Sequence, residues 1–513
     1  MSAQRRPNIL LIVCDQLSAR ALRLYGNAVC RTPAIDRLGR EGVVFENAYS
    51  NFPLCAPARF ALMTGRLPSR IGAFDNAAEL PAAIPTFAHY LRAAGYYTCL
   101  SGKMHFVGPD QLHGFEDRLT TEIYPSDFGW TPRPDDAGTD GDESSGVSGV
   151  DIVNDSGPIA WSMQLDHDDE VHHRARRRLH ELARDGRDRP FLLTVSYTQP
   201  HDPFVITQPY WDLYDDAEID APRVPMPPEA GRDPHTRFLF EHYGIDRGAI
   251  SVETTIRARR GYYGMISWLD ARIGELTATL SALGLADDTV VMLTSDHGEM
   301  LGERGQWFKK TFFEPAIRVP LLVHAPRRFR PARRTELATL VDVLPTLVDL
   351  AGMGREAVVT PLDGASLLPA LEGRALPRPN RAAAEHLDEG APAPRIMLRE
   401  DSYKLVVSPA YPPMLFDLSR DPDELRDLAG STAHGDTLKR LLDVVAAQWD
   451  LDRLAVDIAG SRRVRWFLRR ALGMGRRQSW EFEPPAESGR SYVRHGDKFP
   501  DVERRHYLPY PGR

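Results

Sequence analysis

The sequence NFPLCAPARFALMTGR, at residues 51–66, contains a Cys-x-Pro-x-Arg motif followed by an apolar run that ends at Gly65. Pro57 has no backbone N–H to donate, so it suits the first turn of a helix, where that donor would have no partner. Cys55 then lies at the positive N-terminal end of the helix, and Arg59 adds a fixed positive charge on the same face. A lone cysteine at such a place is most often an ordinary core residue. The motif therefore indicates an anion site only if the rest of the chain supplies further ligands.

Length and charge narrow the class of protein. The chain has 513 residues, of which 42% are hydrophobic and 26% charged, enough for one large domain and a smaller one. Its 63 basic residues are outnumbered by 71 acidic ones, and the net charge of −8 argues against a nucleic-acid partner. Arginines gather at residues 462–477, but an exposed helix face explains that run equally well.

The cysteines and the apolar runs bear on the compartment. The four cysteines, at positions 14, 30, 55 and 99, form neither a disulfide framework nor a Cys-x-x-Cys pair. The apolar run before Asp15 has about six residues, short of the roughly 7–15 of a signal peptide. No later run reaches the ~18 apolar residues of a membrane span. We therefore expect a cytoplasmic protein without a membrane partner.

Three buried-strand patterns end in polar residues. Asn8–Cys14 leads into Asp15-Gln16, Phe191–Tyr197 leads to His201 between two prolines, and residues 289–293 lead into Asp296-His297. Continuous β-branched runs are typical of parallel strands buried on both faces, and open α/β sheets bind ligands at the carboxyl ends of such strands. Asp15 alone is equally well explained as a turn residue.

The alternation of strand and helix patterns predicts the domain organisation. Residues 1–376 alternate in the manner of a three-layer α/β domain with a mostly parallel central sheet. Residues 377–450 read as a small α+β subdomain, with short antiparallel strands near residues 396–398, 403–407 and 415–418 and a covering helix at 437–449. Residues 451–513 form an arginine-rich extension with scattered aromatics.

Lys103 and His105 stand two apart in an extended segment, so both side chains face the same way and can converge on one anion. Alone, such a pair is more often solvated surface.

Five motifs line up in order along the chain: DQ, CAPAR, SGKMH, PHDP and SDHGEMLGERGQWFKKTFFE. Together they resemble the sulfatase branch of the alkaline phosphatase superfamily over nearly the whole chain. The resemblance is closer still to choline-sulfatases, through GAFDNAAEL, YPSDFGWTP, QPYWDLYDD and tail segments that include SWEF and SYVRH.

The resemblance implies a nucleophile, a cation and an anion site. Cys55 would be oxidised to formylglycine by a formylglycine-generating enzyme, and its hydrate would attack sulfur. One divalent ion is implied, Ca²⁺ first and Mg²⁺ or Mn²⁺ as alternatives, since the ligands are rich in oxygen. Gln16 replaces a second aspartate of many sulfatases and would be at most a weak ligand. The implied metal ligands are Asp15, Gln16, Asp296, His297 and the modified Cys55. The implied catalytic groups are Arg59, which holds the formylglycine, and Lys103, His105, His201 and Lys309, which bind sulfate or move protons.

The implied reaction is hydrolysis of a sulfate monoester, with choline sulfate as the best single substrate. The aromatic residues Tyr124, Phe128 and Trp130 lie in one loop, and the resemblance places Trp130 and Glu385 against the choline cation. Asp75 and Asn76 would line the pocket. One departure is that residues 144–157 are rich in Gly, Ser and Asp where another aromatic wall is expected. The alternatives are an aryl or other small-alkyl sulfatase, a phosphonate or phosphate ester hydrolase, and a non-catalytic binding protein.

The extension is expected to make the contacts of a homo-oligomer, a dimer or tetramer, as tails do in choline-sulfatases. The alternative is an arm packed on its own subunit.

Overall fold

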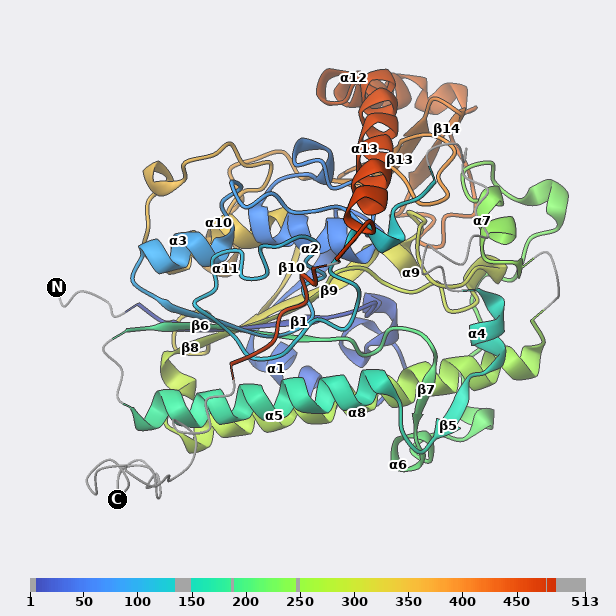
Figure 1. Ribbon diagram of the computed structural model, residues 1–513. Helices are drawn as coiled ribbons and strands as arrows, with labels where there is room; N and C mark the ends of the chain where they lie inside the picture. The colour runs from blue at the N-terminus through green and yellow to red at the C-terminus, as the bar shows by residue number, and fades with distance from the viewer. Residues whose placement is uncertain (1–5, 134–148, 186–188, 246–249, 477, 486–513) are drawn as a thin grey trace, which may run out of the picture.

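The computed structural model describes residues 6–133, 149–185, 189–245, 250–476 and 478–485 (Figure 1). An eight-stranded sheet lies at its centre, in the order β10-β2-β9-β8-β1-β6-β3-β4. The segment from β8 to β4 is parallel, whereas β9 runs antiparallel to both of its neighbours. The strands are β1 (Asn8–Cys14), β2 (Val43–Tyr49), β3 (Tyr97–Gly102), β4 (Asp117–Arg118), β6 (Phe191–Tyr197), β8 (Thr289–Ser295), β9 (Arg318–His324) and β10 (Ala332–Thr339).

Helices cover both faces of this sheet, which confirms the predicted three-layer α/β fold (Figure 1). Along β1, Ile9, Leu11 and Val13 belong to one core, and Leu10 and Ile12 to the other, because successive side chains of a strand point to opposite faces. The first core packs under α2 (Cys55–Thr64), α3 (Phe87–Ala93) and α10 (Val343–Leu350). The second packs against α1 (Pro33–Glu41), α5 (Met163–Arg184) and α8 (Val252–Ala282).

A separate four-stranded antiparallel sheet follows, formed by β11 (Arg381–His386), β12 (Arg395–Glu400), β13 (Tyr403–Ser408) and β14 (Tyr411–Asp417). One face, with Ala384 and Met397, packs on Phe312 and Phe313 of the α/β part. The other packs under α12 (Gly435–Gln448). The antiparallel subdomain was predicted, although β11 was not, and the domain limits at residues 376 and 450 stay predictions.

The remaining elements border the site or connect the layers. Figure 1 shows α13 as a long helix rising beside α12, with its C-terminal end close to α2. None of the helices in the described ranges is long and apolar enough to cross a membrane. These elements are α4 (Val150–Asn154), β5 (Gly157–Ile159), β7 (Val205–Thr207), α6 (Gln208–Trp211), α7 (Arg237–His242), α9 (Glu314–Ile317), α11 (Leu368–Leu371) and α13 (Leu451–Leu472).

Candidate active site

The helix α2 begins at Cys55, as the motif predicts, and ends at Gly65 with a φ of +66°. No side chain of the preceding residue caps it. Instead the amide oxygen of Asn76 accepts a hydrogen bond from the backbone N–H of Ala56 at 2.9 Å. Asn76 therefore satisfies one of the donors that every helix leaves free at its start.

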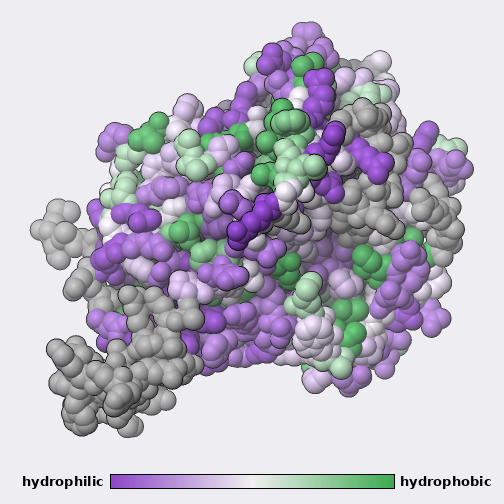
Figure 2. Space-filling view, viewed as in Figure 1, coloured by the Kyte–Doolittle hydropathy of each residue, from purple (hydrophilic) through white to green (hydrophobic). Residues whose placement is uncertain are grey.

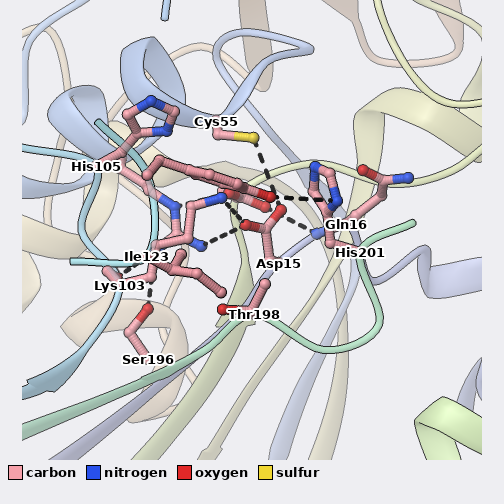
Figure 3. A network of polar contacts seen from close by, with 12 residues as sticks. Asp15, Gln16, Cys55, Lys103, His105, Ile123, Ser196, Thr198 and His201 are labelled. Carbon is pink, nitrogen blue, oxygen red and sulfur yellow. Dashed lines mark hydrogen bonds and ion pairs between the residues drawn. The ribbon is translucent and has the colours of Figure 1, made fainter. Parts of the chain in front are cut away.

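Four buried ligand groups meet where β1, β8 and α2 converge. The thiol of Cys55 and one ligand atom each from Asp15, Asp296 and His297 all lie within 4.8 Å of one another. The Cys55 sulfur is 3.2 Å from Nε2 of His297 and 3.7 Å from Oδ1 of Asp15. Figure 3 shows Cys55 and Asp15 pointing toward each other. The carboxyl ends of two adjacent parallel strands thus bring together residues 281 positions apart, as expected for an α/β sheet.

Positive side chains surround this cluster. Arg59 is fully buried, and its guanidinium lies 2.8 Å from Asp296 and 3.3 Å from Asp15. It also donates to the carbonyl of Lys103 at 2.6 Å and to the hydroxyl of Ser196 at 2.8 Å. The ammonium of Lys103 pairs directly with Asp15. Arg59 therefore ties α2 to the ends of β3, β6 and β8.

The charges keep Asp15 ionised despite its burial. Burial alone would raise its pKa, but the charges of Lys103 and Arg59 hold the pKa well below the ordinary value. A buried carboxylate that is ionised and shares a site with a second carboxylate and a histidine is suited to a divalent cation.

Gln16 adopts a left-handed backbone conformation with a φ of +63°. Its amide nitrogen donates to Asp202 at 3.0 Å and to Glu299, and its amide oxygen accepts from Lys309. The oxygen thus faces an ammonium rather than the ligand cluster. Its role as a weak metal ligand stays a prediction.

Lys309 and His201 form a second polar pair. The Lys309 ammonium is 2.6 Å from Nε2 of His201, and Nδ1 of that ring is 2.7 Å from the carbonyl oxygen of Asp202. A carbonyl only accepts, so Nδ1 carries the proton and Nε2 accepts from the ammonium. Burial alone would lower the pKa of Lys309, but the neighbouring Cys55, Asp202 and Asp15 raise it above its ordinary value. Lys309 is therefore a charged donor at the site.

His105 is almost completely buried, and among the described residues neither of its ring nitrogens has a hydrogen-bond partner. Its backbone N–H donates to Glu122 at 2.8 Å, which fixes an unusual φ of +62°. Burial, followed by the charges of Lys103 and Arg59, lowers the pKa of His105 well below its ordinary value. A neutral imidazole with two free nitrogens is available to a bound substrate.

An aromatic wall stands beside His105. The ring centroid of Tyr124 lies 5.3 Å from that of His105, and Trp130 lies 5.6 Å from it at an interplanar angle of 71°. Tyr124 and Trp130 are themselves 5.0 Å apart. The Lys103 ammonium lies over the Tyr124 ring at 4.2 Å, so one cation already occupies a face of that ring.

Phe128 and Glu385 each have a partner outside the aromatic wall. Phe128 packs edge-on against Trp480, at 5.5 Å between ring centroids. Glu385 is fully buried, and its carboxylate accepts from the backbone N–H and hydroxyl of Ser69 and from the indole of Trp449. The carboxylate of Glu385 thus joins the end of α12 to the loop after α2, and its place against the choline cation stays a prediction.

Asp75 is also committed to another partner. It is fully buried, and both of its oxygens accept from the guanidinium of Arg465 in α13. The neighbouring Asn76 touches α2 through Ala56, as described above. Of the two predicted pocket residues, Asn76 is thus the one next to Cys55.

Several carboxylates that position the site were missed in the sequence. Each accepts hydrogen bonds from two backbone N–H groups of a segment that carries site residues. No spacing distinguishes them from solvated acids, and Asp168 is one of several acids in α5. They are Glu122, which accepts from Met104 and His105; Asp168, which accepts from Thr198 and Gln199; and Glu299, which accepts from Leu301 and Phe308.

The geometry agrees with comparisons to known proteins. The model of the Sulfatase family matches residues 7–353. The chain belongs to the sulfatase family. A second model, N-sulphoglucosamine sulphohydrolase, C-terminal, matches residues 302–449. The protein is accordingly a sulfuric ester hydrolase with the alkaline-phosphatase-like fold of the family.

Individual relatives narrow the comparison. This sulfatase is 41% identical to the choline-sulfatase of Rhizobium meliloti (strain 1021), over 95% of this chain and 96% of that protein. The phosphonate monoester hydrolase SpPMH from Silicibacter pomeroyi has a TM-score of 0.69 and 25% identity, and the match covers 86% of this chain and 96% of that one. A 2-O GAG sulfatase shares the fold with a TM-score of 0.66 and 21% identity, over 86% and 92% of the two chains.

Proposed function

We propose that this sulfatase hydrolyses choline sulfate to choline and sulfate, with Cys55 as the nucleophile after its conversion to formylglycine by a maturation enzyme. The observation that carries the proposal is the juxtaposition of a strongly positive anion site with the Tyr124–Trp130 wall. An anion and a quaternary ammonium are the two ends of choline sulfate. The 41% identity to a choline-sulfatase supports the same substrate.

The sulfate end would bind among Lys103, His201 and Lys309, beside the start of α2. A sulfate monoester repels a nucleophile until its oxygens meet positive groups, and preorganised charges in a buried site are worth more than in water. The hydrate of a Cys55-derived aldehyde supplies one hydroxyl whose oxygen attacks sulfur while the bond from sulfur to the choline oxygen breaks. The second hydroxyl then gives up its proton and its oxygen becomes the aldehyde oxygen, as the C–O bond to the bound sulfate breaks and sulfate leaves. Arg59 holds the segment in place through Asp296 and Ser196.

The residues present fit a divalent cation. Asp15, Asp296, His297 and the modified Cys55 would hold it, and a mainly oxygen donor set favours Ca²⁺, with Mg²⁺ or Mn²⁺ as alternatives. Bound there, the ion would act as a Lewis acid that draws charge from the sulfate oxygens.

Proton transfer would be divided between the two histidines. Choline leaves as an alkoxide, a poor leaving group that needs a proton. We assign this donation to the pair of Lys309 and His201, because their 2.6 Å contact already holds a proton between two nitrogens. His105 is neutral and has free ring nitrogens, so we assign it the acceptance of the nucleophile's proton.

The ammonium end would lie on Trp130. The Lys103 ammonium already lies over one face of the Tyr124 ring. Trp130, by contrast, makes an edge-to-face contact with His105, with 71° between the two ring planes. Glu385, whose carboxylate the resemblance places against the choline cation, would supply the negative charge, and here it is held by Ser69 and Trp449.

The test compares kcat/KM for choline sulfate and 4-nitrophenyl sulfate in the wild type and in Trp130→Ala. Loss of a cation–π contact in a desolvated pocket costs about 2 kcal/mol, roughly thirtyfold, and we expect this loss for choline sulfate only. Trp161→Ala, which alters an exposed tryptophan, is the control and should change neither substrate. An equal loss of kcat/KM on both substrates would contradict the proposal that Trp130 binds the choline ammonium.

A second candidate is a phosphonate or phosphate ester hydrolase. The fold match to a phosphonate monoester hydrolase at 25% identity supports it, and the same positive groups would bind phosphorus oxygens. Phenyl phosphonate and a phosphodiester, assayed on the same preparation, separate the two. The sulfate proposal predicts that choline sulfate has the higher kcat/KM.

We also propose that α13 takes part in a homo-oligomer, a dimer or tetramer. Val456, Val464 and Phe467 are exposed on its outer side, and Figure 2 shows hydrophobic side chains along this part of the surface. Asp452 lies in the first turn and Arg470 in the last. Two copies of α13 packed antiparallel across a two-fold axis would place these opposite charges together and cover the apolar face. Residues 486–513, which carry SYVRH, lie outside the described residues.

A further inference from the structure

Two arginines of the helix α13 form ion pairs with buried carboxylates of other segments. Of its 22 residues only Ile458 and Arg465 are buried. Arg465 forms two parallel hydrogen bonds to the fully buried Asp75, and Arg462 forms an ion pair with the buried Asp388. Bidentate pairs between guanidinium and carboxylate are directional, so they define the position of the helix as well as its attachment.

The Arg465–Asp75 pair continues directly to the nucleophile. Asp75 is followed by Asn76, whose amide oxygen accepts from the N–H of Ala56, the residue next to Cys55. Asp75 also accepts from the backbone N–H of Ala77 at 2.9 Å, so both sides of Asn76 are held. Only one peptide unit and two hydrogen-bonded contacts separate α13 from the start of α2.

A second contact of the same helix reaches the aromatic wall. The indole N–H of Trp466 donates to the carbonyl oxygen of Pro132 at 2.6 Å, two residues after Trp130. Trp466 is adjacent to Arg465 in sequence, and α13 packs against the short helix of residues Phe128–Trp130. One turn of α13 therefore touches both the segment beside Cys55 and the segment of Trp130.

We propose that Arg465 and Asp75 are positioning residues of the active site, and that α13 holds the nucleophile end of α2 and the aromatic wall at a fixed separation. Neither side chain touches the reacting atoms. They act through Asn76 on one side and, together with Trp466, through Pro132 on the other. The inference rests on the proposed role of Cys55 as nucleophile.

A purely stabilising helix would behave differently from a positioning one. Removal of a merely structural contact lowers the melting temperature but leaves the kcat of the folded fraction unchanged. A displaced nucleophile lowers kcat, because misplacement of about 1 Å by a remote mutation can cost roughly a hundredfold. KM for the sulfate group changes less, since Lys103 and Lys309 stand on other segments.

The test uses full-length, matured enzyme with choline sulfate and 4-nitrophenyl sulfate. The variants are Arg465→Met, Asp75→Asn and the double variant, with Arg463→Met as the control on the exposed side of the same helix. We expect each single variant to lower kcat on both substrates by about 10- to 100-fold. The double variant should lose no more than the larger single loss, because both remove one interaction. Arg463→Met should match the wild type.

A folded Arg465→Met or Asp75→Asn enzyme with wild-type kcat would overturn the inference, as would additive losses in the double variant. Arg465→Lys is the second variant, because it keeps the charge but makes only one hydrogen bond. We expect an intermediate kcat and faster hydrogen exchange at residues 55–57, and unchanged exchange there would also reject the idea. If the wild type carries no aldehyde and turns over no sulfate ester, the proposed function fails instead, which is a different outcome.

Discussion

His105 is a buried imidazole whose pKa lies well below its ordinary value, mainly because burial disfavours the imidazolium form. Lys103 and Arg59 lower it further. We expect the ¹³Cε1 signal of His105 to show no titration between about pH 8 and 6, with free histidine in the same buffer as the reference signal. In the unfolded chain His105 binds a proton near pH 6.5, so acidification below about pH 6.5 should reduce the free energy of unfolding. A titration midpoint near 6.5 in the folded protein would contradict this reading.

Cys55 carries the other residue-level prediction. After co-expression with a formylglycine-generating enzyme, the peptide that contains Cys55 should be about 18 Da lighter than the cysteine form, because the thiol is replaced by an aldehyde. Cys55→Ser, produced in the same way, is the control and should show neither the mass change nor turnover. Full activity of a preparation that contains only unmodified cysteine would reject the mechanism.

Sequence patterns predicted individual residues well where a motif concentrates several of them. Asp15, Asp296 and His297 each follow a buried strand, and the structure brings them together with Cys55. Glu385 was harder, because the AAAEH pattern carries no information on which partner a buried carboxylate has. The donors Ser69 and Trp449 lie 316 and 64 positions away in the sequence.

At the level of elements, Gly261 lets α8 approach the loop that bears His201. A Cβ at this position would lie 2.2 Å from the backbone oxygen of Phe204, three residues after His201. Alanine normally stabilises a helix interior relative to glycine by roughly 0.5–1 kcal/mol. Here we expect Gly261→Ala to destabilise the protein by about 1–3 kcal/mol and to lower kcat, because the loop must move.

The matched control is Gly274→Ala in the same helix. Its added Cβ would meet only the Ala34 side chain, at 3.2 Å. Melting temperature and kcat, measured side by side, separate the two glycines. If Gly261→Ala raised the melting temperature and kept kcat, the close approach would have no importance for the site.

Strands and helices of the α/β part were predictable from their hydrophobic runs, but strand direction was not. The buried apolar run of β9 resembles the runs of the parallel strands in the same sheet. Nevertheless β9 is antiparallel to both of its neighbours, β2 and β8. Direction depends on the path of the connecting chain, which hydrophobicity does not encode. The same limit applies to β11, whose alanine-rich sequence has low strand propensity and is recruited by pairing with β12.

For the whole molecule, the exposed apolar side of α13 predicts assembly. Phe467→Asp should lower the apparent mass in light scattering, because it places a charge in the proposed helix–helix contact. Lys439→Asp, a charge change of an exposed residue on α12, is the control. Truncation after about Gly475 should likewise lower the mass if residues beyond α13 contribute. If neither Phe467→Asp nor the truncation changes the oligomeric state, the assembly proposal is wrong and α13 contacts only its own subunit.

Contacts between the two ends of the chain were beyond sequence reasoning. Arg465 and Asp75 are 390 positions apart, and no spacing links an arginine in a basic run to one aspartate among many. The extension was expected to serve neighbouring subunits, and the structure adds an attachment to its own catalytic domain. Only the folded structure, in which α13 packs beside the loop that follows α2, brings these residues together.

The burial of Cys55 also sets a time limit on its chemistry. Only 1% of the residue is exposed in the folded protein, so an oxidising enzyme cannot reach the thiol once β8 has joined β1. His297, at the end of β8, is made 242 positions after Cys55. At roughly 5–20 residues per second, the ribosome needs roughly 12–48 s to reach it. Oxidation of Cys55 must therefore be complete before the rest of the domain is translated and folded. Slower translation between codons 55 and 297 should raise the fraction of chains in which Cys55 is converted to formylglycine.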